Sequence, residues 1–155
     1  MSAPRLRRLH KDYEWVQKVY FDHPHVIVRA LDDTSTPERY VVDFNVTGAA
    51  WDPERDRPVR VHTHRVEIFL PAEYPRQEPH CVMATGYFHP NIGLKNGINH
   101  FVCIGDAWNP TQQLWETIAK VGEMLQYQDY NTDSPLDRVA ARWTLDNPSL
   151  FPLGD

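Results

Sequence analysis

The chain has 155 residues, of which 41% are hydrophobic, and its formal net charge is −5. This length predicts one domain with room for a proper core, and the acidic balance argues against a nucleic-acid partner. No apolar run approaches the roughly 20 residues that span a bilayer, and the N-terminus lacks the apolar segment of a signal peptide. We therefore expect no membrane partner. Two cysteines make no disulfide framework, so we expect a reducing compartment, the cytoplasm.

The first predicted element is a helix over residues 4–20. Apolar side chains recur there at spacings of three and four, the period of one helix face: Leu6, Leu9, Tyr13, Val16 and Tyr20. Four basic residues fall off that face, namely Arg5, Arg7, Arg8 and Lys11. They could be a solvated face, or they could form a basic docking surface for an acidic partner.

A sheet is predicted over residues 25–86. Strand-like runs at 25–31, 38–47 and 59–70 are joined by polar loops at 32–37 and 48–58, and a fourth short strand holds Cys81. Successive strands with short connections favour a four-stranded antiparallel meander. Because it lies within a strand, Cys81 is expected to belong to the core.

A functional loop is predicted over residues 87–108, where glycines and asparagines favour turns and Cys103 supplies a thiol. Asn109 as a cap and Pro110 in the first turn predict a central helix over 109–128. A short helix over 135–143 and a tail over 144–155 complete the chain. This order of elements predicts an α+β fold with helices packed on one antiparallel sheet, in a single domain over 1–155.

Five short motifs then follow one another in a fixed order. They are Tyr74-Pro75 with Pro79, His89-Pro90-Asn91, Cys103, Trp108-Asn109-Pro110, and Ser134-Pro135-Leu136. The ordered set resembles the ubiquitin-conjugating enzymes over roughly residues 6–143. The resemblance implies the UBC-like fold and a transferase without cofactor or metal. Such a carrier accepts a ubiquitin-like protein from an activating enzyme as a thioester on Cys103 and passes it to an amine of a target, usually a lysine.

The resemblance also implies roles for the residues around the thiol. The amide of Asn91 could donate to the developing oxyanion, or it could brace the loop. His89 is expected to bond within the turn that Pro90 fixes, with Trp108 as a further support of the site. An acid usually orients the attacking amine. Ser134 occupies the matching position here, so either Asp106 or Asp133 would have to serve, or no acid does.

Because the rest of the chain is acidic and would repel an acidic partner, we expect the basic group of Arg5, Arg7, Arg8 and Lys11 to meet an acidic surface on the activating enzyme, unless it is only a solvated face. Arg76 replaces an apolar residue that commonly contacts RING-type ligases, and Thr111 follows Pro110 where a proline-alanine step is usual. A RING-type ligase is therefore not expected as a partner.

Other departures concern the length of segments. The gap from Asn91 to Cys103 is longer than is usual in the family, and the gap from Cys103 to Trp108 is shorter. The twelve residues after Trp143 are too few for the family's final long helix. These features favour a trimmed, prokaryote-like member, and some relatives of that kind serve bacterial antiviral defence.

Other classes of function stay open at this point. A binding module of the same fold, of the RWD type, would need no thiol chemistry. A cysteine hydrolase would pair Cys103 with His89 or His100. Histidines and cysteines could also bind zinc, although no Cys-x-x-Cys or His-Glu-x-x-His spacing occurs in the sequence.

Overall fold

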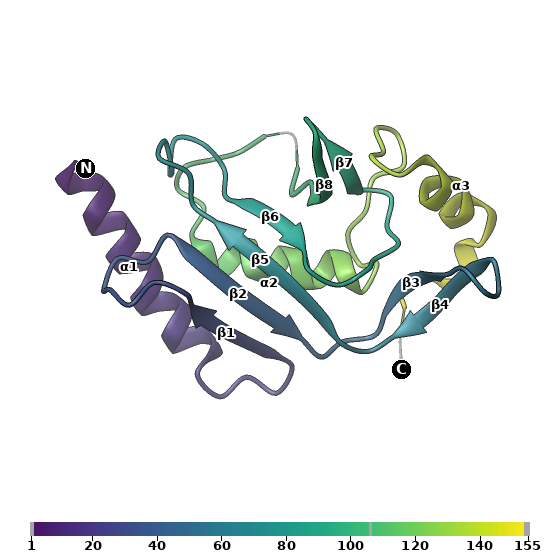
Figure 1. Cartoon of the computed structure of the whole chain (residues 1–155), viewed down its shortest axis with the longest axis horizontal. Helices are drawn as coiled ribbons and strands as arrows, with labels where there is room; N and C mark the ends of the chain where they lie inside the picture. The colour runs from purple at the N-terminus through teal and green to yellow at the C-terminus, as the bar shows by residue number, and fades with distance from the viewer. Residues whose placement is uncertain (1, 106, 154–155) are drawn as a thin grey trace.

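Six strands form one antiparallel sheet in the order β1-β2-β5-β6-β8-β7 (Figure 1). The computed structural model describes residues 2–105 and 107–153. The strands are β1 (Val26–Ala30), β2 (Arg39–Phe44), β5 (His64–Phe69), β6 (His80–Met83), β7 (Ile92–Lys95) and β8 (Ile98–Val102). In β5, buried and exposed side chains alternate, which is the signature of a sheet with one face on the core. The α+β class is confirmed, but the prediction of four strands is wrong, because β7 and β8 extend the sheet.

Residues 48–61 form a separate antiparallel hairpin of β3 (Gly48–Asp52) and β4 (Arg57–Val61). The predicted loop over 48–58 and the unbroken strand over 59–70 are therefore wrong. Pro58 lies in β4 opposite Trp51. A proline is tolerated there because β4 pairs with β3 alone, so the missing N–H can face away from the ladder.

Three α-helices and one short 3-10 turn complete the described chain: α1 (Ala3–Tyr20), α2 (Leu114–Leu125), α3 (Arg138–Asp146) and η1 (Pro148–Leu150). The prediction of α1 is confirmed to within one residue. Ser2 caps it, since its hydroxyl accepts from the N–H of Arg5. No helix in the described part of the chain has the length and apolar character needed to cross a membrane.

The start of α2 differs from the prediction. Asn109 caps a turn instead of the helix, because its side-chain oxygen accepts from the N–H of Thr111 at 3.0 Å. The helix begins at Leu114, where the Glu116 carboxylate accepts from the N–H of Gln113 at 3.2 Å. It ends at Leu125, just before Tyr127 adopts a positive φ of 58°.

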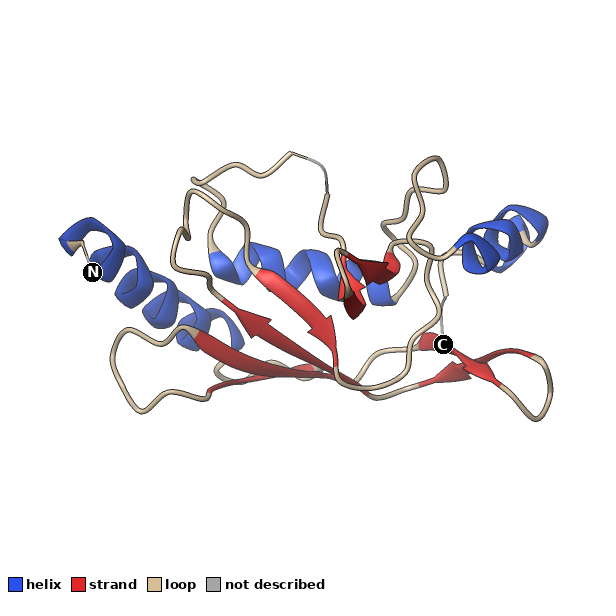
Figure 2. Ribbon diagram, turned by 45° about the horizontal axis from the view of Figure 1, so that its top comes forward, coloured by secondary structure: helices blue, strands red, loops and turns tan. Residues whose placement is uncertain are grey.

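The last helix begins three residues later than predicted. The side-chain oxygen of Asp137 accepts from the N–H of Ala140 at 2.9 Å and caps α3. The helix then runs to Asp146, beyond the predicted end at 143. Figures 1 and 2 show α3 beside the β3–β4 hairpin, at the opposite end of the molecule from the start of α1.

The main core lies between the sheet and the first two helices. α1 and α2 contact each other, and both contribute fully buried side chains to one cluster with β2 and β5, among them Leu9, Val42, Val66 and Ile118. A smaller cluster joins the hairpin to α3 through Ala49, Phe88 and Ala140. Both clusters support the segment around Cys103: Val102 and Ile104 on either side of it belong to the main cluster, and Phe88 before His89 belongs to the smaller one.

Two of the four basic residues on α1 are structural. Arg5 is only 8% exposed, and its guanidinium donates to the carbonyls of Pro71 and Ala72 and to the Glu38 carboxylate. The expectation that Arg5 lies on a solvated docking face is therefore wrong. A guanidinium has enough donors to satisfy several carbonyls at once, so it can be buried where a lysine could not.

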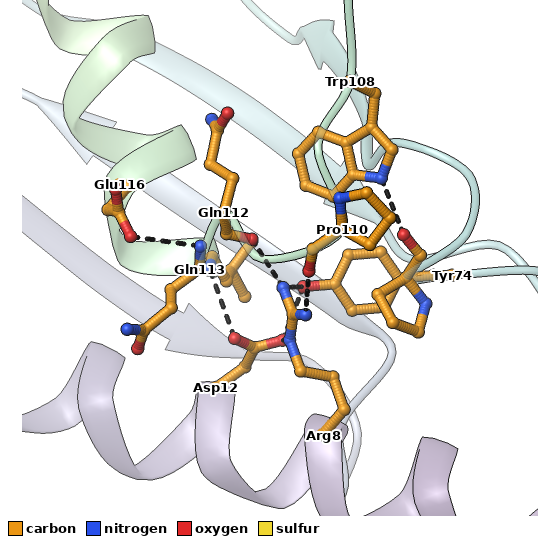
Figure 3. Close-up of polar contacts among 10 residues, drawn as sticks. Arg8, Asp12, Tyr74, Trp108, Pro110, Gln112, Gln113 and Glu116 are labelled. Carbon is orange, nitrogen blue, oxygen red and sulfur yellow. Dashed lines mark hydrogen bonds and ion pairs between the residues drawn. The ribbon is translucent and has the colours of Figure 1, made fainter.

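Arg8 joins α1 to the start of α2 (Figure 3). Its guanidinium donates to the Asp12 carboxylate and to the Tyr74 hydroxyl at 3.0 Å each, and to the carbonyl of Gln112 at 2.5 Å. This arrangement does not favour the docking role expected for Arg8, because its side chain is 16% exposed and already donates to four acceptors within the chain. Arg7 and Lys11 are the two basic residues of this group that are exposed.

Candidate active site

The site begins with the turn at His89. Its ring is fully buried, Nδ1 accepts from the N–H of Asn91 at 2.9 Å, and Nε2 lies 3.1 Å from the carbonyl oxygen of Asp129. Nε2 must therefore carry the proton. Burial lowers the pKa of His89 to about 4, with the Asp129 carbonyl opposing the shift, so the ring is neutral at pH 7. His89 thus holds the turn and is not free to exchange protons.

Asn91 braces the site from the other side of the turn. Its side-chain oxygen accepts from the N–H of Asn131 at 2.8 Å, and its Nδ2 donates to the carbonyl of Asn131 at 2.9 Å. Its own carbonyl accepts from the N–H of Cys103 at 2.9 Å. One hydrogen of the amide remains for a further acceptor. Pro90 adds to the brace, because its carbonyl accepts from the N–H of Leu136 at 2.8 Å.

Cys103 directly follows β8, and its side chain is partly exposed. The segment predicted as a functional loop over 87–108 is therefore partly wrong, since it contains the β7–β8 hairpin. Asn96 and Gly97 form the turn with φ of 50° and 78°. Asn-Gly between apolar runs is a strong hairpin signal, so the sequence did contain the evidence. Val102, the last residue of β8, pairs with Ile92 of β7 and with Cys81 of β6, so the thiol of Cys103 lies just beyond the end of a strand that is paired on both sides.

Two lysines lie at the thiol. Lys95 Nζ is 3.9 Å from Cys103 Sγ, and the same ammonium lies 5.3 Å from the centre of the Phe101 ring. Lys120 Nζ makes an ion pair of 3.0 Å with Asp129. A small pocket of about 60 Å³ opens here, with Asn91, Cys103, Lys120 and Asp129 among the residues that line it. The sequence suggests Lys95 only as a loop residue that could help place the acceptor, and the contact of its ammonium with the sulfur depends on the folded hairpin.

Of the three residues considered at the position of the assisting acid, the structure describes Ser134 and Asp133. Ser134 lines the pocket. Asp133 is exposed, and its N–H donates to the side chain of Asn131 at 2.8 Å. Asp106 lies outside the described residues. The acid that does line the pocket is Asp129, which the sequence analysis missed because only the carbonyl contact with His89 brings it there.

Trp108 supports the site at a distance from the pocket lining. Its indole N–H donates to the carbonyl of Pro75 at 2.6 Å, and its ring lies against Tyr74 with centres 6.2 Å apart (Figure 3). The Tyr74-Pro75 motif and the Trp108 motif, which are 33 residues apart in sequence, are thereby joined in space.

Cys81 is fully buried in β6. Burial, and to a smaller extent the nearby charge of Glu78, raises the pKa of its thiol to about 12. A thiol of this kind is not a nucleophile at neutral pH. Of the two cysteines, Cys103 is the candidate for chemistry.

The hydrolase alternative finds little support in this geometry. A hydrolase needs an imidazole nitrogen free to take the thiol proton, and both nitrogens of His89 are engaged with main-chain atoms. His100 is exposed on β8, where its φ is 59°.

Comparisons with known proteins agree with this architecture. The profile of a family described as "Ubiquitin-conjugating enzyme" matches residues 8–152. Ubiquitin-conjugating enzyme E2 N of Macaca fascicularis is 32% identical over 90 residues, which is 57% of each chain. Ubiquitin-conjugating enzyme E2 27 of Arabidopsis thaliana is 26% identical over 94 residues, or 61% of this chain and 48% of that protein. The chain thus spans about half the length of the curated relatives it matches.

Solved structures show the same fold at lower identity. A putative ubiquitin conjugating enzyme from Plasmodium yoelii gives a TM-score of 0.64 at 19% identity, over 97% of this chain and 90% of that one. An E2 domain of a Toxoplasma gondii ubiquitin conjugating enzyme gives 0.62 at 19% identity, over 94% and 90%. At this identity the likeness establishes the fold alone.

Proposed function

The chain belongs to the ubiquitin-conjugating enzyme family, and on this premise we propose that it carries a ubiquitin-like protein as a thioester on Cys103. It would accept that protein from an activating enzyme and transfer it to an amine of a target. The observation that carries the proposal is the partly exposed thiol at the end of β8, next to a turn braced by His89 and Asn91.

The first step is exchange between two thioesters. The sulfur of Cys103 attacks the carbonyl carbon of the incoming thioester, and the thiol of the activating enzyme leaves. One thiol replaces another, so the step requires no strong base. This matches a site in which the buried histidine is neutral and fully bonded.

The second step is attack by an amine, with the Cys103 sulfur as the leaving group. The remaining amide hydrogen of Asn91 could donate to the oxyanion. Loss of such a donor typically costs about 10²–10³ in rate. Asp129 and Ser134 line the pocket beside the thiol, where an acceptor amine would enter. Asp129 is already paired with Lys120, which keeps its carboxylate oriented.

Exposed residues bear on two further proteins, the activating enzyme and a RING-type ligase. Arg7 and Lys11 remain exposed on α1 and are the candidates for contact with the activating enzyme. Arg76 is 80% exposed and pairs with Glu73. To place this guanidinium in the apolar pocket of a RING-type ligase would break that pair and bury a charge, so we expect transfer without such a ligase.

From the sequence resemblance alone, we place the reaction in the cytoplasm of a bacterium, in an antiviral defence system. Neighbouring genes for an activating enzyme and a ubiquitin-like protein would support this.

The test is a charging assay with the activating enzyme and ubiquitin-like protein encoded beside the gene. A non-reducing gel should show a band that thiol reagents remove. Cys103→Ala should lose this band, and Cys103→Ser should give a thiol-resistant oxyester. Cys81→Ala is the matched control, because it removes the other sulfur and should keep the band. A band that persists in Cys103→Ala would refute the proposal, and a binding module without chemistry would give none.

The same reaction, extended with a target protein, tests the ligase. Product formation with these components alone supports transfer without a ligase. A strict requirement for a further protein whose binding is lost on Arg76→Ala would show that a ligase reads this surface through the arginine.

A further inference from the structure

We propose that Lys95 is an acyl acceptor within the chain, and that its amine takes the acyl group from the Cys103 thioester to leave a stable amide on β7. The inference rests on the proposed function, since it needs an acyl group on Cys103. It identifies a modification site and states which amine of this protein competes with the target.

The distance between the two groups supports this assignment. Lys95 Nζ lies 3.9 Å from Cys103 Sγ. The carbonyl carbon of a thioester is one bond from that sulfur, so it can reach the roughly 3–3.5 Å separation of reacting atoms without movement of the strands.

The hairpin holds the amine in this position. Lys95 pairs with Ile98 across the Asn96-Gly97 turn, so its backbone is fixed by the ladder. Its ammonium also lies over the ring of Phe101, which is 6% exposed. An amine confined beside its electrophile reacts as though present at a very high concentration, up to about 10⁵–10⁸ M in well-oriented cases.

Lys120 provides the contrast. It lines the pocket beside Cys103, which Lys95 does not, but its ammonium makes an ion pair with Asp129 at 3.0 Å. That pair would have to break before the amine could attack. The geometry therefore favours Lys95 over the other lysine near the thiol.

The chemistry is balanced without another reactant. The neutral amine of Lys95 attacks the thioester carbonyl carbon, a C–N bond forms, and the C–S bond breaks. The proton lost by nitrogen goes to the departing sulfur. The products are an amide on Lys95 and a free thiol on Cys103.

The experiment uses a short synthetic peptide that ends in a glycine mercaptoethanesulfonate thioester. This probe loads a reactive cysteine directly, so neither activating enzyme nor ubiquitin-like protein is needed. Intact mass spectrometry follows the adduct, and hydroxylamine distinguishes the labile thioester from the stable amide. We expect thioester first and then amide, with proteolytic mapping of the amide to Lys95.

Variants separate the acceptors. Lys95→Arg keeps the charge and the stem over Phe101 but removes the amine, so its thioester should persist and the stable adduct should be lost. Lys120→Arg is the matched control and should still form the stable adduct. Cys103→Ala should form neither product, because the acyl group reaches Lys95 only through the sulfur.

A mixture of Cys103→Ala and Lys95→Arg tests transfer within one chain, and no stable adduct should appear on either protein. An adduct on Cys103→Ala in the mixture, a stable adduct in Lys95→Arg, or a wild-type thioester that never converts would each overturn the inference. The last result would leave the proposed function intact. Failure to load any peptide on Cys103, together with no band in the charging assay, would refute both. Conversion of the peptide thioester to the amide, but no band in the charging assay with the activating enzyme, would refute the proposed function alone.

Discussion

His89 organises the reactive turn through a neutral, buried ring. Its two nitrogens bond to main-chain atoms of two distant segments, the N–H of Asn91 and the carbonyl of Asp129. The ring also packs on Tyr127, with centres 4.8 Å apart, and Tyr127 in turn stacks on Phe151. The imidazole therefore connects the turn at His89–Asn91 with the residues after α2, and through Tyr127 with Phe151 near the end of the described chain.

Acid should destabilise the protein through this ring. The pKa of His89 is about 4 in the folded chain, below the ordinary value of about 6.5. The unfolded chain therefore binds the proton first as pH falls. The neutral ring contributes fully to the free energy of unfolding above about pH 6.5, and this contribution is lost as pH approaches about 4. The loss amounts to roughly 3 kcal/mol.

Urea unfolding at about pH 7 and about pH 4 measures this effect. His89→Gln removes the titrating ring and should be less stable at neutral pH, but its stability should fall less on acidification. His64, whose pKa burial also lowers, is present in both proteins and cancels in the comparison. Equal losses in wild type and His89→Gln would contradict the prediction.

At this scale, sequence motifs identified the residues but not their neighbours. Cys103, His89 and Asn91 could be named because their motifs follow one another in a fixed order. The contacts of Lys95, Asp129 and Asn131 with the site could not be predicted, because each forms only after the hairpin and the segment after α2 have folded.

Elements were predicted well where the signal is local and periodic. α1 was predicted because apolar residues recur along one face of the helix over its whole length of 18 residues. The start of α2 was missed because, besides the local bond between Glu116 and Gln113, its first turn is held by an acceptor on another helix. Asp12, on α1, accepts from the N–H of Leu114 at 3.2 Å across 102 residues. The β3–β4 hairpin was missed because Pro58 suggested a break in a place where an edge strand tolerates proline.

The contact between α1 and α2 should be costly to remove. Asp12 is 1% exposed and accepts from Arg8, from the Tyr74 hydroxyl at 2.5 Å and from Leu114. Asp12→Ala would leave a mostly buried guanidinium and the helix N–H without their acceptor. We expect a loss of about 3–5 kcal/mol in the free energy of unfolding.

Urea denaturation measures the loss, and Glu14→Ala is the matched control on the same helix. Glu14 is 53% exposed and pairs only with His10 among the ion pairs of the described residues, so its removal should cost about 0–1 kcal/mol. Similar losses in the two variants would show that the buried carboxylate adds no more than a surface one.

At the scale of the whole molecule, the basic residues of α1 divide into two groups. Arg5 and Arg8 point into the protein, while Arg7 and Lys11 face solvent. The sequence placed all four off the apolar face and could not divide them, since the carbonyls and carboxylates that hold the two arginines come from distant segments.

Reversal of the exposed charges should slow charging without unfolding the protein. Arg7→Glu with Lys11→Glu should lower the initial rate of thioester formation several-fold at low salt and flatten its dependence on salt, because long-range attraction to an acidic partner is lost. Arg5→Glu reverses a buried charge and serves as the comparison. It should unfold at a lower urea concentration than the wild type, because it buries an unpaired carboxylate. Unchanged charging of the double variant at low salt would show that this face is merely solvated.

Arginine is also the cation in most ion pairs of the described residues, as in Arg39–Asp32 and Arg65–Asp43. Of the sixteen basic residues in the sequence, twelve are arginines and four are lysines. A guanidinium stays protonated and is no acyl acceptor at neutral pH. The proposed carrier would thus gain most of its salt bridges from a cation that cannot take the acyl group from Cys103. Few lysine amines would compete with the target, and the β7–β8 hairpin holds one of them, that of Lys95, 3.9 Å from the thiol sulfur.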